Sequence, residues 1–101
     1  MRKTKIICTL GPSTDQDGVL ETLILEGMNV ARFNFSHGAH EEQKVRLEQL
    51  KELRKKHNKP IAALLDTKGP EIRLKCFEND SVILEPEQQF TLGVGDFLGN
   101  Q

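Results

Sequence analysis

Apolar and polar positions follow two alternating patterns over residues 1–69. Short apolar runs rich in strand-forming residues occupy 5–10, 28–34 and 61–66. Between them, apolar residues recur at helical spacing in 19–27 and 39–57. The order strand, helix, strand, helix, strand predicts an α/β fold, a βαβαβ unit with parallel strands. Gly27 and Asn58 follow the helical patterns as stop signals.

The last of these runs, residues 61–66, is almost continuously apolar. This pattern is typical of a parallel strand that is buried on both faces. After Pro70 the pattern changes, and no helical spacing follows. Short segments of alternating polarity lie at 71–77, 81–84 and 89–92. They predict antiparallel β-strands, so we expect one part of the chain at residues 1–69 and a second part, a small β module, at 70–101.

Composition narrows the function classes. The 101 residues are 37% hydrophobic with a formal net charge of −1, which excludes bulk electrostatic attraction to nucleic acid or anionic membranes. The longest apolar stretches have about five residues, far fewer than a membrane span or a secretion signal requires, and we expect a cytoplasmic protein. Cys8 and Cys76 lack disulfide or zinc spacing, and Cys8 is expected to be a buried thiol.

The second predicted strand carries chemistry on one of its two faces. Strand side chains alternate, so Arg32, Asn34 and Ser36 share one face. The apolar side chains of Ala31, Phe33 and Phe35 take the other face. The first and third strands likewise carry Thr9 and Asp66 near their C-terminal ends. Because ligands of parallel α/β sheets bind at these ends, the pattern predicts a site for an anionic ligand.

Three motifs in this order resemble the N-terminal part of pyruvate kinase. They are TKIICTLGPS at 4–13, MNVARFNFSHG at 28–38 and LDTKGPEIR at 65–73. The resemblance implies that residues 1–69 begin the catalytic (β/α)8 TIM barrel of that family. It implies that residues 70–101 begin an inserted β-barrel domain. The implied activity is phosphoryl transfer from phosphoenolpyruvate to ADP, giving pyruvate and ATP.

The resemblance also implies roles for single residues. Arg32 contacts the substrate phosphate, which suits a permanently charged side chain that grips phosphate with parallel hydrogen bonds. Asn34, Ser36 and Asp66 bind K⁺ together with the backbone carbonyl of Thr67. Potassium-dependent members of the family tend to carry Glu where this chain has Glu71, and potassium-independent ones Lys.

The nucleotide phosphates are implied to face Asn34, Phe35, Ser36, His37 and Arg73. The catalytic lysine and the ligands of Mg²⁺ lie on later strands in this family, outside this chain. We therefore expect the 101-residue chain alone to be inactive, and the parent enzyme to be a homotetramer.

Other interpretations of the same residues stay open. Arg32 can pair with a neighbouring carboxylate, and Arg73 with Glu71 or Glu85. Asn34 and Ser36 can cap the following helix, while Asp66 bonds turn amides. A strand-end arginine also suits other phosphate-binding TIM-barrel enzymes. A non-catalytic folding or interaction fragment with open sheet edges is the competing class of function.

Overall fold

The computed structural model describes residues 2–100 of the chain. It divides into two compact units, Met1–Gly69 and Pro70–Gln101. That these units are parts of a barrel and of an inserted domain stays a prediction.

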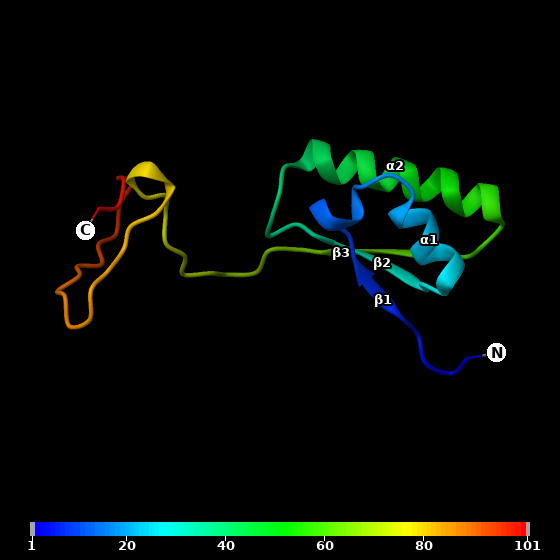
Figure 1. Ribbon diagram of the computed structural model, residues 1–101, viewed down its shortest axis with the longest axis horizontal. Coiled ribbons are helices and arrows are strands. Elements are labelled where there is room, and N and C mark those ends of the chain that lie inside the picture. Colours follow the sequence, from blue (N-terminus) through cyan, green and yellow to red (C-terminus); the bar gives the residue numbers. More distant parts are fainter. Residues whose placement is uncertain (1, 101) are drawn as a thin grey trace. The chain divides into compact units, whose positions relative to one another are not determined.

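The first unit is a three-stranded parallel sheet with two α-helices. Its elements are β1 (Ile7–Thr9), the 3-10 helix η1 (Pro12–Thr14), α1 (Val19–Glu26), β2 (Val30–Asn34), α2 (His40–His57) and β3 (Ala62–Asp66). The strand order is β1-β2-β3, with both pairs parallel (Figure 1). The predicted βαβαβ unit is therefore confirmed.

Both helices end at the predicted stop signals. Gly27 caps α1 in the left-handed conformation, with φ of 117°, and its N–H bonds to Ile24 O. Asn58 caps α2 with φ of 50°. Gly18 is the N-cap of α1. Thr14 closes η1, exchanging 2.9 Å hydrogen bonds with the backbone of Gly11.

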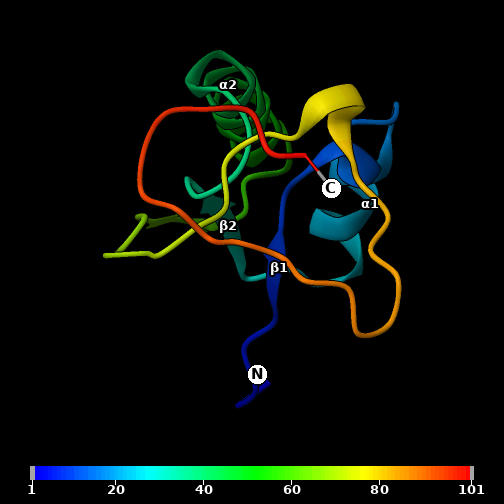
Figure 2. The same cartoon turned by 90° about the vertical axis from the view of Figure 1, so that its left-hand side faces the viewer.

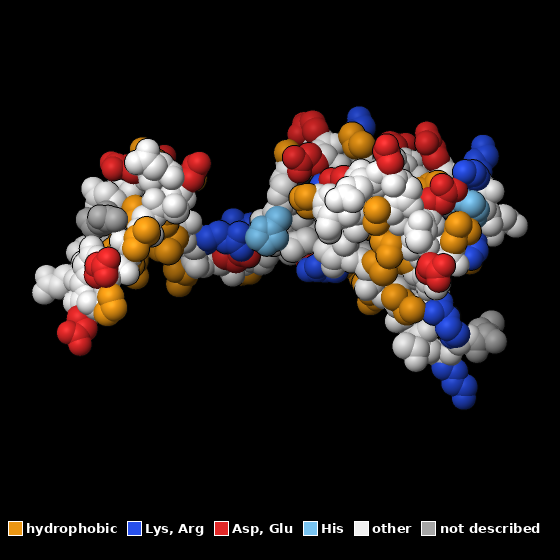
Figure 3. All heavy atoms as spheres, viewed as in Figure 1, with side chains coloured by type: hydrophobic (Ala, Val, Ile, Leu, Met, Phe, Trp, Pro, Cys, Tyr) orange, Lys and Arg blue, Asp and Glu red, His pale blue; other side chains and the backbone are white. Residues whose placement is uncertain are grey.

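The core lies on one face of the sheet, between the strands and both helices. Figure 2 views α2 nearly end-on and shows the two helices on the same side of the strands. The buried apolar residues of the cluster are Leu10, Leu20, Ile24, Met28, Ala31, Phe33, Leu50 and Ile61. Cys8 packs against this cluster but is only half-buried, because β1 is an edge strand. The outward side of α2 carries charged side chains (Figure 3).

The expectation that residues 61–66 are buried on both faces is wrong for this structure. Four of the five residues of β3 are exposed, and Leu65 is 60% exposed. The physical reason is position: β3 is an edge strand, and α1 and α2 pack mainly over β1 and β2. An apolar strand is thus left largely uncovered on both of its faces.

The second unit does not form the antiparallel strands that its alternating pattern predicts. Among residues 70–100 the structure has a short 3-10 helix, η2 (Glu78–Asp80), and one isolated parallel bridge between Phe77 and Gly99. Ile72 and Val94 are fully exposed. Short alternating segments gain stability only when paired strands bury a shared apolar face, and these segments bury none.

Candidate active site

Polar side chains from all three strands lie on the sheet face opposite the helices. Thr9 is the register partner of Arg32, and Asn34 is the register partner of Asp66. All four side chains point to the same face, because register partners on neighbouring strands share a face and side chains two residues apart on one strand do so too. Thr9, Asn34 and Asp66 are the last residues of their strands, and Arg32 lies two residues before the end of β2.

Arg32 is held by partners on both sides. Its Nε donates to Asp66 Oδ2 at 2.9 Å, and its Nη2 donates to the same oxygen. Its Nη1 donates to Thr9 Oγ1 at 3.0 Å. The side chains of Arg32 and Asp66 are 31% and 43% exposed, so the pair is accessible to solvent and to a ligand. The pairing with a neighbouring carboxylate, one of the open interpretations of Arg32, is therefore present.

Asn34 and Ser36 form a local turn. Asn34 Oδ1 accepts a hydrogen bond of 3.1 Å from the Ser36 backbone N–H. Neither residue caps α2, whose N-cap is Ala39. Asp66 joins the same region through its backbone, because its carbonyl accepts the Phe35 N–H at 2.9 Å. The helix-capping interpretation of Asn34 and Ser36 is therefore wrong.

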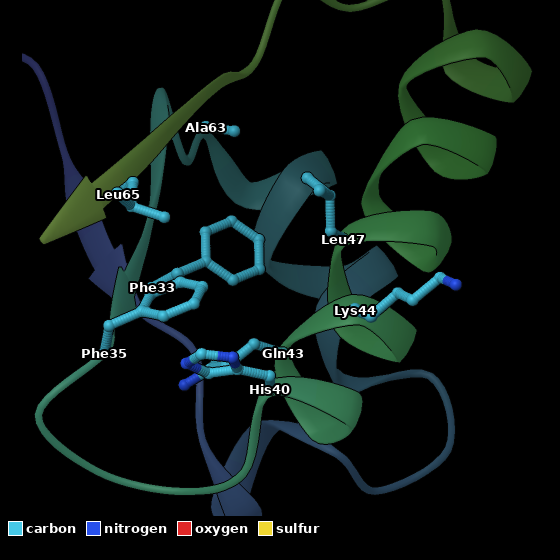
Figure 4. Close-up of a pocket in the computed structure, with 8 residues that line it drawn as sticks. All are labelled: Phe33, Phe35, His40, Gln43, Lys44, Leu47, Ala63 and Leu65. Carbon is cyan, nitrogen blue, oxygen red and sulfur yellow. The ribbon is translucent and has the colours of Figure 1, made fainter. Parts of the chain in front are cut away.

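The remaining predicted site residues lie in different surroundings. The Phe35 ring turns to the helix side, where it lies 5.4 Å from the His40 ring centroid (Figure 4). His37 lies in the turn after β2, and Thr67 is exposed directly after β3. Arg73, in the second unit, pairs with Glu71 at 2.9 Å, as one open interpretation held. Within the first unit, Arg32, Asn34 and Asp66 are thus brought together, and the Phe35 side chain is not.

A cavity of about 240 Å³ lies on the helix side of the sheet. Figure 4 shows Phe33, Phe35 and Leu65 of the strand segments facing Leu47 and His40 of α2. Gln43, Lys44 and Ala63 complete its wall. The cavity is mostly apolar and lies on the opposite face from Arg32, so it is separate from the polar site.

Sequence reasoning missed a buried polar network behind this site. Gln43 and Arg46 of α2 are 4% and 5% exposed. They share the helical stripe of the buried Leu50, at i, i+3 and i+7, and this spacing was the signal that could have found them. Arg54 of the same helix is half-buried and donates to Ile61 O at 2.8 Å.

The donor set limits the kind of ion that the site suits. Among residues 2–100, no three His, Cys, Asp or Glu side chains gather as a metal cluster. Asn34 and Asp66 instead place an amide and a carboxylate side by side on neighbouring strands. Oxygen ligands with a single negative charge fit a monovalent hard cation.

Among residues 2–100, no helix is long and apolar enough to cross a bilayer.

Parallel strands with polar ends, covered by helices on the opposite face, define an α/β protein of the class that binds ligands at the carboxyl edge of its sheet. The comparison with known families is more specific. The sequence profile described as "Pyruvate kinase, barrel domain" matches residues 1–101, and the chain belongs to this family.

Individual relatives agree with the family match. Over 99 residues the chain is 46% identical to the pyruvate kinase of Staphylococcus epidermidis, and the same holds for that of Staphylococcus aureus. The alignments cover 98% of this chain and 17% of each relative, so the chain spans about a sixth of their length.

Solved structures give the same result. A crystal structure of Cryptosporidium parvum pyruvate kinase has 47% sequence identity and a TM-score of 0.73, and it covers 79% of this chain and 17% of that one. A second pyruvate kinase structure from this organism has 48% identity and a TM-score of 0.68, with coverages of 77% and 16%.

Proposed function

We propose that this chain supplies part of the active site of a pyruvate kinase, which transfers a phosphoryl group from phosphoenolpyruvate to ADP. The observation that carries the proposal is the group formed by Arg32, Asn34 and Asp66 at the carboxyl edge of the sheet. Phosphoryl transfer depends on positioning and on neutralisation of charge. An arginine and oxygen ligands on one rigid edge suit both tasks.

Arg32 is proposed to bind the substrate phosphate. A guanidinium has five N–H donors, and the bonds to Asp66 and Thr9 use three of them. These bonds hold the guanidinium plane in a fixed direction while its charge stays accessible. The ion pair with Asp66 therefore supports the proposed contact between Arg32 and phosphate, because it orients the guanidinium.

A K⁺ ion is proposed to bind to Asn34, Ser36, Asp66 and the backbone carbonyl of Thr67. When bound, it supplies positive charge close to the phosphoryl groups. The register pairing of Asn34 with Asp66 supports this set, because neighbouring strands lie about 4.8 Å apart. Glu71 favours dependence on potassium, by the family pattern.

The nucleotide phosphates are proposed to face the segment Asn34–His37, with Arg73 added from the second unit on the basis of family resemblance. Because the Phe35 ring faces the helix side, this residue is proposed to contribute its backbone only. Residues outside this chain are proposed to hold Mg²⁺. We further propose that residues 70–101 begin the inserted β domain, and that the whole protein is a cytoplasmic homotetramer.

A non-catalytic role as a folding or interaction fragment is the second candidate. The exposure of the apolar strand β3 favours it, since an uncovered edge strand recruits other strands. Concentration-dependent association of the isolated chain, abolished by a charge at Leu65, is the expected behaviour under this candidate.

The test of the enzyme proposal is a chimera in which residues 1–101 replace the matching segment of Staphylococcus epidermidis pyruvate kinase. We expect turnover of phosphoenolpyruvate and ADP by the chimera, and its loss in the Arg32→Ala chimera. A chimera with the circular dichroism and oligomeric state of the relative but without turnover contradicts the proposal. The isolated chain is expected to be inactive.

A further inference from the structure

The buried side chain of Gln43 on α2 forms hydrogen bonds with both ends of the segment between β2 and α2. Its Nε2 donates to Asn34 O at 3.1 Å and to His37 O at 3.3 Å. These two carbonyls lie at the two ends of the segment that carries Asn34 and Ser36. One buried side chain therefore fixes both ends of the segment that is proposed to bind a cation.

Asn34 is held at both of its oxygen atoms. Its backbone carbonyl accepts from Gln43 Nε2 and also from the His37 N–H at 3.3 Å. Its side-chain Oδ1 accepts from the Ser36 N–H. A carbonyl oxygen has two lone pairs, and Gln43 supplies the donor for one of them. The direction of the Asn34 side chain thus depends on Gln43 through the backbone.

Arg46 determines which way the Gln43 amide points. Its Nη1 donates to Gln43 Oε1 at 3.3 Å. Because arginine has donors only, the amide oxygen must face Arg46, and the amide nitrogen then faces the two carbonyls.

Asp15 in turn fixes Arg46. Arg46 Nε donates to Asp15 Oδ1 at 2.7 Å, and Nη2 donates to Oδ2 at 2.6 Å, a bidentate arrangement. The hydrogen bond with Arg46, aided by its charge, lowers the pKa of Asp15 below its usual value. A chain of contacts therefore runs from the residue after η1, through α2, to the segment after β2.

We propose that Gln43 is a positioning residue for the cation site, and that it sets the affinity for K⁺ by holding Asn34 and the Asn34–His37 segment in place. This proposal rests on the proposed function. Residues that orient metal ligands without touching the metal change metal affinity by about 10- to 100-fold when they are replaced. A purely structural role for Gln43 predicts lower stability without a change in K⁺ affinity.

Two replacements separate these roles. Gln43→Met keeps the length and helix propensity of the side chain but removes its donors. Gln43→Glu keeps an acceptor for Arg46 and also removes the donors toward the carbonyls. Gln49→Met is the matched control, because Gln49 is an exposed glutamine on the same helix.

The first measurement is amide hydrogen exchange by NMR on the full chain, which needs no bound ion and no activity. We expect exchange at the His37 and Ser36 amides to accelerate about tenfold in both Gln43 variants, because the hydrogen bonds from Gln43 to this segment are lost. Exchange at Leu50 and in the Gln49→Met control is expected to stay unchanged. Equal acceleration along all of α2, or acceleration in Gln43→Met alone, overturns the proposal.

The second measurement is K⁺ titration of turnover in the chimera. We expect both Gln43 variants to need about tenfold more K⁺ for half-maximal activity, with the KM for phosphoenolpyruvate at saturating K⁺ within about twofold of the parent. If the parent chimera turns over without any need for K⁺, the proposed cation site is wrong. If the parent needs K⁺ and the Gln43 variants titrate like Gln49→Met, only the positioning role is wrong. A lower kcat with unshifted K⁺ dependence also overturns the positioning role.

Discussion

Arg32 and Asp66 form an ion pair across the face of the sheet that the helices leave open. The pair is diagonal, because Asp66 lies two residues beyond Leu64, the register partner of Arg32. The proposed ligand of the substrate phosphate and the proposed ligand of the cation are thus in direct contact. A change at either residue is expected to affect both binding events.

Loss of the forked geometry of Arg32 is expected to weaken substrate binding even when the charge is kept. In the chimera, Arg32→Lys removes the paired Nε and Nη2 bonds to Asp66 and the fixed plane of the donors. We expect kcat/KM for phosphoenolpyruvate to fall by about 10- to 100-fold, from steady-state kinetics. Unchanged kcat/KM contradicts the proposed contact with phosphate.

The hydroxyl of Ser36 is expected to contribute to K⁺ binding. Ser36→Ala removes the hydroxyl but keeps the backbone N–H that bonds to Asn34 Oδ1. In the chimera, the K⁺ concentration for half-maximal turnover is expected to rise about tenfold. The control is a titration with tetramethylammonium, a cation that carries one positive charge but cannot be coordinated by these oxygen atoms. An increase in turnover equal to that with K⁺ contradicts the proposed site.

The ion pair between Asp15 and Arg46 is expected to make stability depend on acid pH. The pKa of Asp15 in the folded chain lies below its usual value of 3.8, chiefly because of the hydrogen bond from Arg46. The pair therefore stabilises the fold above pH 3.8, and this contribution is lost as the pH falls through the lowered pKa. Urea unfolding of the full chain and of Asp15→Asn is expected to show a difference in the free energy of unfolding at pH 7 that narrows below pH 4. A difference that stays constant over this pH range contradicts the prediction.

The core beneath α2 is expected to dominate the stability of the first unit. Leu50 is fully buried, so Leu50→Ala is expected to lower the free energy of unfolding by about 2–5 kcal/mol. Val45 lies on the same helix but is 60% exposed, and Val45→Ala is expected to change it by less than about 0.5 kcal/mol. Urea denaturation measures both, and similar losses from the two variants contradict the packing described above.

The cap at Gly27 provides a test of backbone strain. Its φ of 117° is unfavourable for other residues, and an added Cβ would lie 2.7 Å from Arg2 Nη2. Gly27→Ala is therefore expected to destabilise the chain by about 1 kcal/mol or more. A Cβ added at Gly69 would enter open space, and Gly69→Ala is expected to be neutral or stabilising by up to about 1 kcal/mol. Thermal unfolding compares the two variants, and only Gly27→Ala is expected to lower the melting temperature.

Local patterns were sufficient to predict the elements of the first unit. Gly27 and Asn58 end helices because of their own conformational preferences, and the alternation around Arg32 assigns its face directly. The partner of Arg32 could not be predicted in this way, because Asp66 is 34 positions away and meets it only through the parallel register.

Burial was harder to predict than secondary structure. The apolar run of β3 indicates a strand that favours burial, but whether it is covered depends on what packs against it. The same reason explains the second unit, where alternating segments such as 81–84 lack a shared apolar face. Gln43 and Arg46 show the opposite case, since polar side chains on a core stripe are buried because Asp15 and two carbonyls satisfy them.

The strict alternation in β2 also limits which length changes the gene can tolerate. One residue inserted between Val30 and Arg32 would turn Arg32 toward the helices and Phe33 toward the polar site, because a one-residue slip exchanges the two faces of a strand. The same event would thus remove the ligand-binding side chain and place a charge in the core. Single-residue insertions and deletions are therefore expected to be excluded from this strand.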